Sequence, residues 1–289
     1  MSIYNAKGNP LLNAYNLNGG QISSAYNIDG RQIFPDAQST LKIMSYNVGA
    51  WTAFGNNATQ ENQETWYTLQ NNILAEEQAD LIGIQEYEDA IGSYNVPAMI
   101  RQYAPYLFDV DRVNNKAGRA IASKYLMTNS REINFTNQNG EIRSYLIGDV
   151  NIGGKMIKFI TTHLALDNAT VALQIQELLT AVESFEYWII TGDFNINFPN
   201  AQSEGYSILI EPFLNEGYNV ANGDPNGFGF IPAFSTGTPE QDTGWAYLDN
   251  IMCSSNIEIA NVYVNRQKIT EHAGYAIDHL PLIAEVVVN

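Results

Sequence analysis

The stretch Ile189-Ile190-Thr191-Gly192-Asp193-Phe194-Asn195 carries polar side chains at the end of an apolar run. The apolar residues predict a buried strand at residues 188–191, and Gly192 lets the backbone approach a neighbouring segment closely. Asp193 and Asn195 then stand two positions apart in the loop that follows the strand. Their carboxylate and amide can face one phosphate group, or they can serve only as an Asp/Asn turn cap.

Five further segments place polar side chains beside predicted strands. They are residues 45–47 (SYN), 85–86 (QE), 162–164 (THL), 248–251 (LDNI) and 278–281 (DHLP). Together the segments supply carboxylates, amides and imidazoles at what we expect to be one end of a sheet. A hard divalent cation takes oxygen ligands and an attacking water needs a base, so this set suits metal-assisted hydrolysis of a phosphate ester.

In this order the segments resemble the motifs of the endonuclease/exonuclease/phosphatase superfamily, which includes DNase I, abasic-site endonucleases, neutral sphingomyelinases and inositol phosphatases. The resemblance covers residues 40–288. Any one of the short motifs is common, but all of them in this order form a specific pattern. The resemblance implies an α/β fold of the DNase I-like type, a four-layer α/β/β/α sandwich whose site lies where loops of both sheets meet.

The resemblance also implies a metal site. Glu86, helped by the side-chain oxygen of Asn47, is implied as the principal ligand of Mg²⁺ or Mn²⁺, and Asp278 as a second carboxylate near the metal. Zinc is not expected, because these ligands are oxygen atoms. Taken singly, Glu86 is explained as an exposed side chain and Asn47 as a turn residue.

The remaining motif residues are implied to bind and activate the reactants. Asp193 is expected to orient or deprotonate the attacking water, and Asn195 to bind a non-bridging phosphate oxygen. His279 is the general base or the group that polarises the phosphate, with Asp249 orienting its imidazole. His163 is expected to donate a hydrogen bond to a phosphate oxygen or to the leaving group.

Further candidates flank these motifs. Arg143 opens the predicted strand at residues 142–150 and is expected to bind phosphate through its bidentate guanidinium. Arg119 and Tyr125 are additional candidates. Ile277 departs from the family's Ser-Asp-His-Leu-Pro motif by replacing the serine, and no role is assigned to His272.

The net charge of −17 over 289 residues weighs against a polyanionic substrate. The charge is unevenly distributed, because eight of the 14 Lys and Arg residues lie between Arg112 and Lys158. That window carries +5 and the rest of the chain −22. The window predicts either a basic face that contacts phosphates or solvated cations on the outer edges of strands.

The first 38 residues form an internal repeat that is separate from these motifs. Tyr-Asn-x-x-Gly recurs every 11 residues from Tyr4 to Gly30, as in phage tail and cell-surface proteins, which it resembles. Short strands joined by tight turns bury little apolar area alone, so they must pack on another surface. We expect a small β appendage at residues 1–38 and a catalytic domain at residues 39–289. The appendage covers a sheet edge, or attaches the chain through residues 1–35 to a protein assembly such as a phage particle.

Hydrophobic periodicity predicts the remaining elements. Helices are expected at residues 60–77, 97–103, 171–182 and 203–214. Strands are expected at residues 41–46, 81–84, 120–123, 142–150, 156–161, 188–191, 248–253, 257–264 and 282–288. Residues 218–245 are the expected substrate-facing loop, in which aromatic side chains either stack on bases or pack the loop against the domain.

Bulk properties bound the class of protein. No apolar run reaches the ~18 residues needed to span a bilayer, and residues 1–5 lack a signal-peptide pattern. The single Cys253 excludes an internal disulfide and a cysteine-built zinc site. The expected protein is soluble, and cytoplasmic or virion-associated.

These observations predict a metal-dependent phosphodiesterase that works by in-line attack of water, with DNA as the expected substrate of a DNase I-like endonuclease. The alternatives are a sphingomyelinase-type or inositol-phosphate hydrolase, or a structural or binding component tethered by its repeats. The lack of a signal peptide and of a clear aromatic hairpin weighs against a lipid substrate. The joint presence of Glu86, Asp193, Asp249 and His279 weighs against a purely structural protein.

Overall fold

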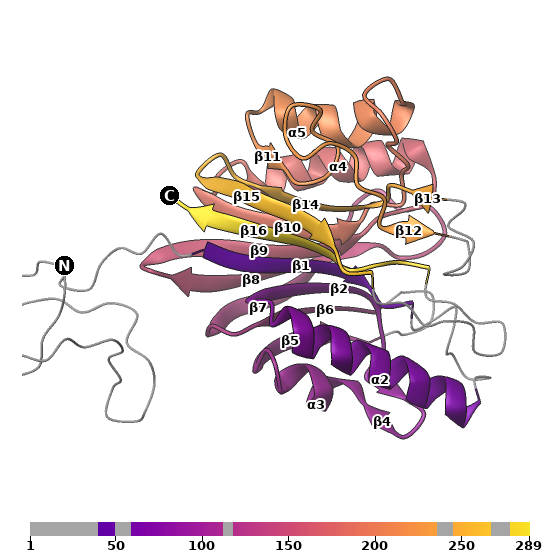
Figure 1. Cartoon of the computed structure of the whole chain (residues 1–289). Coiled ribbons are helices and arrows are strands. Elements are labelled where there is room, and N and C mark those ends of the chain that lie inside the picture. The colour runs from indigo at the N-terminus through magenta and orange to yellow at the C-terminus, as the bar shows by residue number, and fades with distance from the viewer. Residues whose placement is uncertain (1–39, 50–58, 112–117, 236–244, 267–277) are drawn as a thin grey trace, which may run out of the picture.

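The computed structural model describes residues 40–49, 59–111, 118–235, 245–266 and 278–289. Two six-stranded sheets lie face to face, with helices on both outer faces (Figure 1). The predicted appendage at residues 1–38 and its attachment role lie outside the described residues and stay predictions. His272 and Ile277 also lie outside them.

The first sheet has the strand order β15-β16-β1-β2-β6-β5, and the second has the order β11-β14-β10-β9-β8-β7. The strands of the first sheet are β1 (Thr40–Asn47), β2 (Leu81–Tyr87), β5 (Tyr106–Val110), β6 (Gly118–Ser123), β15 (Ile257–Val264) and β16 (Leu282–Val288). Those of the second sheet are β7 (Met127–Asn134), β8 (Ser144–Ile152), β9 (Lys155–His163), β10 (Tyr187–Asp193), β11 (Asn219–Val220) and β14 (Asp249–Cys253). Two small hairpins are formed by β3 (Ala90–Ile91) with β4 (Tyr94–Asn95) and by β12 (Phe234–Ser235) with β13 (Trp245–Ala246).

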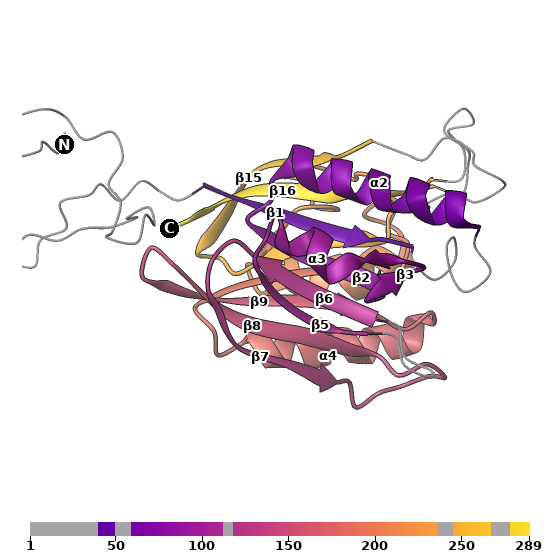
Figure 2. The same cartoon turned by 90° about the horizontal axis from the view of Figure 1, so that it is seen from below.

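Helices cover the outer face of each sheet and complete four layers. α2 (Gln60–Glu77) and α3 (Val96–Arg101) lie on the first sheet, as the view from below shows (Figure 2). α4 (Asn168–Val182), a π-helical turn (Tyr206–Ile210) and α5 (Glu211–Asn215) lie on the second sheet. Separate apolar clusters fill the space under each helical layer and the space between the sheets. The predicted α/β/β/α sandwich is confirmed.

Helix α2 shows how the sequence sets this packing. Its apolar side chains recur at helical spacing and are buried against the first sheet: Trp66, Leu69, Ile73 and Leu74. Full burial of one such side chain, as at Ile73, stabilises the fold by about 1.5–3 kcal/mol. The Thr59 side chain caps the first turn, and Gln78 in a left-handed conformation ends the last one. The helix therefore has the bounds that the sequence predicts.

Strand directions bring the motifs to one end of the sandwich. β1 and β2 run parallel, as do β9 and β10, and all four strands end at the same side. β14 and β16 begin at that side, because they pair antiparallel to β10 and β1. The six motif segments therefore meet there, and the C-terminus lies at the opposite end (Figure 1).

The two sheets approach each other closely near the end of the sandwich that carries the motifs. A Cβ atom on Gly83 would lie 1.8 Å from the hydroxyl oxygen of Thr191 in the facing sheet, so glycine is required there. Nearby, the fully buried Gln85 side chain donates a hydrogen bond of 2.8 Å to the hydroxyl of Thr161 across the sheets. These contacts fix the ends of β2 and β10 relative to each other.

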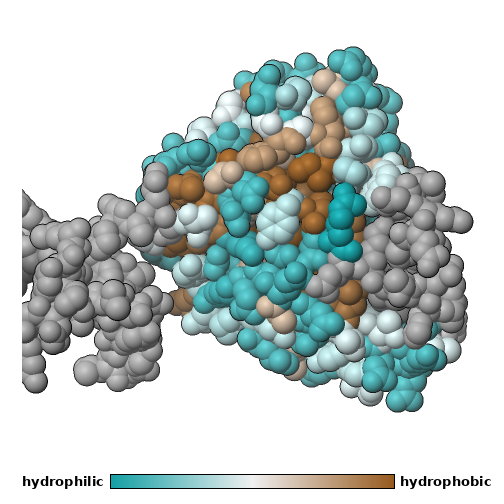
Figure 3. Space-filling view, viewed as in Figure 1, coloured by the Kyte–Doolittle hydropathy of each residue, from teal (hydrophilic) through white to brown (hydrophobic). Residues whose placement is uncertain are grey.

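The surface of the sandwich is hydrophilic over the helices, whereas apolar side chains lie along the β15 edge (Figure 3). Ile259, Val264 and Ile231 are partly buried against the core between the sheets. Among the helices that the structure describes, none is long and apolar enough to cross a membrane.

Among the described strands longer than two residues, two have no counterpart in the sequence-based prediction: β5 and β7. Both lie at a sheet edge, and β7 is polar and interrupted by a bulge between Thr128 and Arg131, so neither shows a clear alternation. The predicted helix at residues 203–214 is confirmed as a helical segment over residues 204–215, within which a π-helical turn (Tyr206–Ile210) precedes α5. Pro212 in the first turn of α5 has no N–H to donate, so the regular α-helical hydrogen-bond pattern is interrupted there.

Candidate active site

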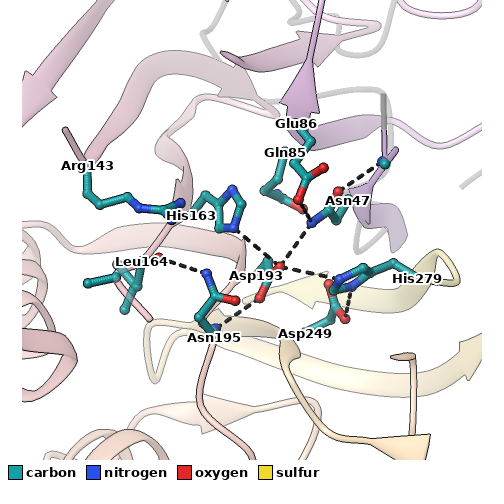
Figure 4. Close-up of polar contacts among 12 residues, drawn as sticks. Asn47, Gln85, Glu86, Arg143, His163, Leu164, Asp193, Asn195, Asp249 and His279 are labelled. Carbon is teal, nitrogen blue, oxygen red and sulfur yellow. Dashed lines mark hydrogen bonds and ion pairs between the residues drawn. The ribbon is translucent and has the colours of Figure 1, made fainter. Parts of the chain in front are cut away.

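A carboxylate at the end of β10 forms the centre of the site. Strand register places Asp193 opposite His163 in β9 and opposite Asp249 in β14. Asp193 is 1% exposed, and its Oδ1 accepts a hydrogen bond of 2.9 Å from the backbone N–H of Asn195. Its Oδ2 faces side chains from both sheets (Figure 4). One buried carboxylate therefore joins the two sheets where the motifs meet.

The first sheet contributes Asn47 and Glu86 to the site. Nδ2 of Asn47 donates to Oδ2 of Asp193 at 3.0 Å and to Oε1 of Glu86 at 3.1 Å. Oδ1 of Asn47 accepts from the backbone N–H of Gly49 at 3.0 Å, which fixes the orientation of the amide. Glu86 lies at an irregularity in the pairing of β2 with β6 and has a φ of 54°. Such a bulge re-aims a side chain, and here the carboxylate faces the site (Figure 4).

His279 and Asp249 form a buried pair beside Asp193. Nδ1 of His279 lies 2.9 Å from Oδ2 of Asp249, and Nε2 of His279 lies 3.5 Å from Oδ2 of Asp193. Burial lowers the pKa of His279, but the two carboxylates outweigh burial and raise it to about 10. The imidazole is therefore protonated at neutral pH and donates its Nδ1–H to Asp249. The geometry brings together the two residues that the sequence pairs.

His163 lies on the other side of Asp193, in a different environment. Its Nε2 is 3.5 Å from Oδ2 of Asp193. Burial, together with the charges of Arg143 and Arg119, lowers the pKa of His163 to about 3 against the opposing effect of Asp193. The imidazole is therefore neutral at neutral pH. Its Nδ1 is buried and has no hydrogen-bond partner among the described residues.

Two buried arginines lie on the His163 side. Arg143 precedes β8, pairs with Glu141 at 2.8 Å and directs its guanidinium toward His163 (Figure 4). Arg119 in β6 is fully buried and donates to the hydroxyl of Ser144 at 2.5 Å. Each guanidinium retains N–H groups without a partner in the described part of the chain. Unpaired N–H donors of two guanidinium cations thus gather on this side, which suits an anion.

Asn195 and Asp278 are the remaining residues that the sequence places in the site. Nδ2 of Asn195 donates to the backbone oxygen of Leu164 at 2.8 Å, and Asn195 has a φ of 53°. Asp278 is partly buried. Burial and, to a smaller extent, the charge of Asp278 raise the pKa of Glu86 and of Asp249. The structure thus gathers the residues predicted from the motifs, together with Arg143, at one end of the sandwich, while their individual roles stay predictions.

Comparison with known proteins assigns the family. A sequence profile described as Endonuclease/Exonuclease/phosphatase family matches residues 14–271. The chain belongs to this family. Members are hydrolases that act on phosphate esters, so the chain is a phosphodiesterase- or nuclease-type hydrolase. No curated protein sequence matches it.

Solved structures of other proteins share the fold at low sequence identity. TDP2 from D. rerio, crystallised with a single-strand DNA product, aligns with a TM-score of 0.63 at 15% identity, covering 86% of this chain and 99% of that one. An endonuclease/exonuclease/phosphatase from Bacteroides vulgatus aligns with a TM-score of 0.65 at 12% identity, covering 87% and 100%. TDP2 from C. elegans aligns with a TM-score of 0.65 at 16% identity, covering 86% and 75%.

Members of the endonuclease/exonuclease/phosphatase family generally use divalent metals, and the site fits a hard cation. Oε2 of Glu86 is buried without a partner among the described residues, and a cation would satisfy it. No three His, Cys, Asp or Glu side chains in the described ranges form a cluster that could enclose a metal. Mg²⁺ commonly uses one or two carboxylates and completes its shell with water and substrate phosphate. Glu86, with Asp278 nearby, therefore fits an open site of this kind, whereas Asn47 turns its NH2 group toward Glu86 and its side-chain oxygen toward the N–H of Gly49, which does not match its predicted role as an oxygen ligand.

The described part of the basic window places arginines, but no lysines, near the site. Arg112 and Lys116 lie outside the described residues. The described lysines of the window lie at the far end of the sheets and pair with carboxylates or a backbone carbonyl: Lys124, Lys155 and Lys158. Tyr125 lies beside Lys124 at that end, so its candidacy as a site residue is wrong. Arg119 and Arg143 approach the site, but both are buried.

The sequence does not predict that Phe234 lies next to the pair formed by His279 and Asp249. Phe234 packs its ring edge-on against the imidazole of His279, with centroids 4.8 Å apart. Phe230 of the same loop packs against Tyr206 and Tyr247 and holds the loop on the domain. The aromatic composition of residues 218–245 is the sequence signal for both, and it does not distinguish a site residue from a packing residue.

Proposed function

We propose that the chain is a DNase I-like nuclease, a metal-dependent phosphodiesterase that cleaves DNA. The observation that carries the proposal is the buried carboxylate of Asp193, in contact with Asn47, His163 and His279 where the two sheets end. This arrangement supplies an acceptor for a water proton and donors for phosphate oxygens within one enclosed space. The fold shared with a TDP2 crystallised with a single-strand DNA product supports DNA as the substrate.

Asp193 holds the attacking water in this proposal and accepts its proton. Burial acts to raise the pKa of Asp193, but the positive charge of His279 and the hydrogen bonds from Asn47 and Asn195 outweigh burial and hold it below its ordinary value. The carboxylate is therefore ionised at neutral pH and orients water for attack on phosphorus. The new bond from the water oxygen to phosphorus forms in line with the bond to the leaving oxygen, which breaks.

His279 and His163 contact the phosphate from opposite sides in this proposal. Protonated His279, held by Asp249, donates from Nε2 to a non-bridging oxygen and stabilises the developing charge. Neutral His163 donates one N–H to a phosphate oxygen or to the leaving oxygen. Arg143 supplies its unpaired N–H on the same side as His163, and Asn195 binds a further oxygen.

Glu86 is the residue that we propose to hold Mg²⁺ or Mn²⁺, with Asn47 and Asp278 beside it. The orphaned Oε2 of Glu86 carries this assignment. When bound, the metal supplies positive charge that neutralises the phosphate and stabilises the leaving oxyanion. The bulge at Glu86 fixes the direction in which the carboxylate points.

Plasmid nicking by the full chain tests the proposed function. The wild-type protein and the His279→Ala variant are assayed in Mg²⁺, in Mn²⁺ and in EDTA. We expect nicking by the wild type with metal, none in EDTA, and a loss of roughly 10²–10⁴-fold in His279→Ala. Absence of nicking with either metal would contradict a nuclease. Parallel assays on sphingomyelin and inositol phosphates would then show whether one of the alternative hydrolases replaces it.

A further inference from the structure

The buried side chain of Asn222 lies between the segments that carry Asp249 and His279. Asn222 follows β11 and is fully buried. Its Nδ2 donates to the backbone oxygen of Asp249 at 3.0 Å and to the backbone oxygen of Ile231 at 2.8 Å. Its Oδ1 accepts from the backbone N–H of Ile231 at 2.7 Å. The side chain of Asn222 therefore joins the backbone of Asp249, the first residue of β14, to the backbone of Ile231.

The segment that follows Asn222 folds back through a tight turn. Gly223 has a φ of 103°, and its N–H donates to the oxygen of Gly229 at 2.7 Å. A Cβ atom on Gly223 would lie 3.0 Å from carbons of Ile210, so the turn is both left-handed and closely packed. This closure brings Ile231 back beside Asn222.

The residues that follow Ile231 contact the backbone at His279. Two residues later, the oxygen of Ala233 accepts a hydrogen bond of 2.6 Å from the N–H of Leu280, the residue after His279. Phe234 forms an isolated β-bridge with His279 and packs its ring against the imidazole. The backbone on which His279 sits is thus tied to the segment that Asn222 holds.

Asn250 fixes Asn222 from the other side. Oδ1 of Asn250 accepts from the backbone N–H of Asn222 at 3.0 Å, and Nδ2 of Asn250 donates to the backbone oxygen of Asn222 at 2.6 Å. Asn250 is also fully buried and follows Asp249 in β14. The two amides therefore form a satisfied buried network, and networks of this kind rigidify the groups that they connect.

We infer that Asn222 is a positioning residue, which sets the distance and orientation between the Asp249 carboxylate and the His279 imidazole. It touches neither the phosphate nor the metal. It acts by holding the backbone of Asp249 directly and that of His279 through Ile231 and Ala233. Its effect on catalysis rests on the proposed function, whereas its effect on the Asp249–His279 hydrogen bond does not.

Asn219 provides a matched control for Asn222. Its Nδ2 also donates to a backbone oxygen, that of Ile257 at 2.9 Å, and so ties the same β11 segment to the chain that follows β14. Asn219 pairs with Cys253, at the end of β14 that is remote from Asp249. Loss of its side chain removes comparable hydrogen bonding without touching the Asp249–His279 pair.

The test compares Asn222→Ala, Asn222→Asp and Asn219→Ala in the full chain, with folding monitored by circular dichroism. Asn222→Asp conserves volume and can still accept from the N–H of Ile231, but it loses both donated hydrogen bonds, so it keeps the test usable if Asn222→Ala does not fold. The first readout is the downfield proton resonance of the His279 Nδ1–H, which reports its hydrogen bond to Asp249. The second readout is kcat and KM for metal-dependent DNA cleavage.

We expect the folded Asn222 variants to shift or broaden the His279 resonance and to lower kcat roughly 10- to 100-fold with little change in KM. Asn219→Ala should leave both readouts at wild-type values. A wild-type resonance and wild-type kcat in folded Asn222→Asp would overturn the inference, as would equal effects in Asn219→Ala. If the wild type cleaves no DNA but the resonance is still lost in the Asn222 variants, the proposed function fails and the positioning role stands.

Discussion

His279 and His163 approach the same carboxylate from opposite sides, each at 3.5 Å, yet their surroundings make the first imidazole positively charged and leave the second neutral. His279 has a second carboxylate, Asp249, on its Nδ1, and its pKa is raised to about 10. His163 has no partner on Nδ1 among the described residues and lies near Arg143, and its pKa is lowered to about 3. The two residues are of the same type and lie at the same distance from Asp193, so neither property decides the protonation state of the imidazole. The other charged groups around each imidazole decide it.

This difference in charge divides the site into two halves: the His279 half, which contains His279 and Asp249, and the His163 half, which contains His163 and Arg143. The His279 half is matched in charge, because its cation is paired with Asp249 and its backbone is held by the Asn222 network, and within it only Oδ1 of Asp249 lacks a hydrogen-bond partner among the described residues. The His163 half contains donors that lack acceptors within the described chain. We therefore expect the first half to be preformed and the second half to be completed by an anionic substrate.

Removal of the shared carboxylate should have the largest effect, because both halves depend on it. In Asp193→Asn we expect the rate of DNA cleavage to fall roughly 10³-fold, through loss of the group that accepts the water proton. Asp149→Asn is the matched control, since Asp149 is a carboxylate of the same sheet, paired with Lys158 at the far end. Comparable losses of cleavage rate in the two variants would place the catalytic centre elsewhere.

Asp249→Asn should make the surroundings of His279 resemble those of His163. The pKa of His279 is expected to fall, because its strongest charge partner is removed, and kcat to fall roughly 10²-fold or more. Steady-state kinetics across pH would measure both changes. An unchanged kcat would mean that the charge on His279 has no part in the reaction.

Arg143→Lys tests the half that contains His163. Lysine retains the charge but loses the planar fork, so we expect KM for DNA to rise about tenfold with kcat changed less. Arg131→Lys serves as the control, because Arg131 is exposed on the edge strand β7. Equal KM values for Arg143→Lys and the wild type would exclude bidentate binding of phosphate by Arg143.

The two histidines should also affect folding stability with opposite signs, although more weakly. His279 has a raised pKa in the folded state, so its contribution is complete below its ordinary value of 6.5 and is lost as pH rises toward about 10. His163 has a lowered pKa, so the unfolded state binds the extra proton and stability falls as pH drops from 6.5 toward about 3. Urea unfolding across pH should show reduced acid sensitivity in His163→Asn. Acid sensitivity equal to that of the wild type would contradict the buried neutral state of His163.

The fold could be predicted from the sequence wherever apolar periodicity is local and complete. Helix α2 and strands β15 and β16 have the predicted bounds, because each shows a clear apolar pattern, which in β15 survives a bulge between Ile259 and Asn261. The predicted site residues converge because parallel strands deliver their carboxyl ends to one edge. In each case the signal lies within a few consecutive residues.

What the sequence did not reveal depends on contacts between distant segments. The bulge that turns Glu86 and the pairing of Asn222 with Asn250 follow from strand register, which no single segment encodes. The charge states of His163 and His279 depend on neighbours from other strands. The sequence likewise left open whether the basic window is a basic face or a set of solvated cations, and strand register places its described lysines, Lys124, Lys155 and Lys158, at the far end of the sheets.

The most direct test of this division is an NMR titration of the Cε1–H resonances of the two histidines in the metal-free full chain, assigned with His163→Asn and His279→Asn. The account predicts that His279 stays protonated well above 6.5, toward about 10, whereas His163 stays neutral well below 6.5, toward about 3. Two histidines that titrate together near 6.5 would contradict it, and would show that Asp193 is not flanked by one charged and one neutral imidazole.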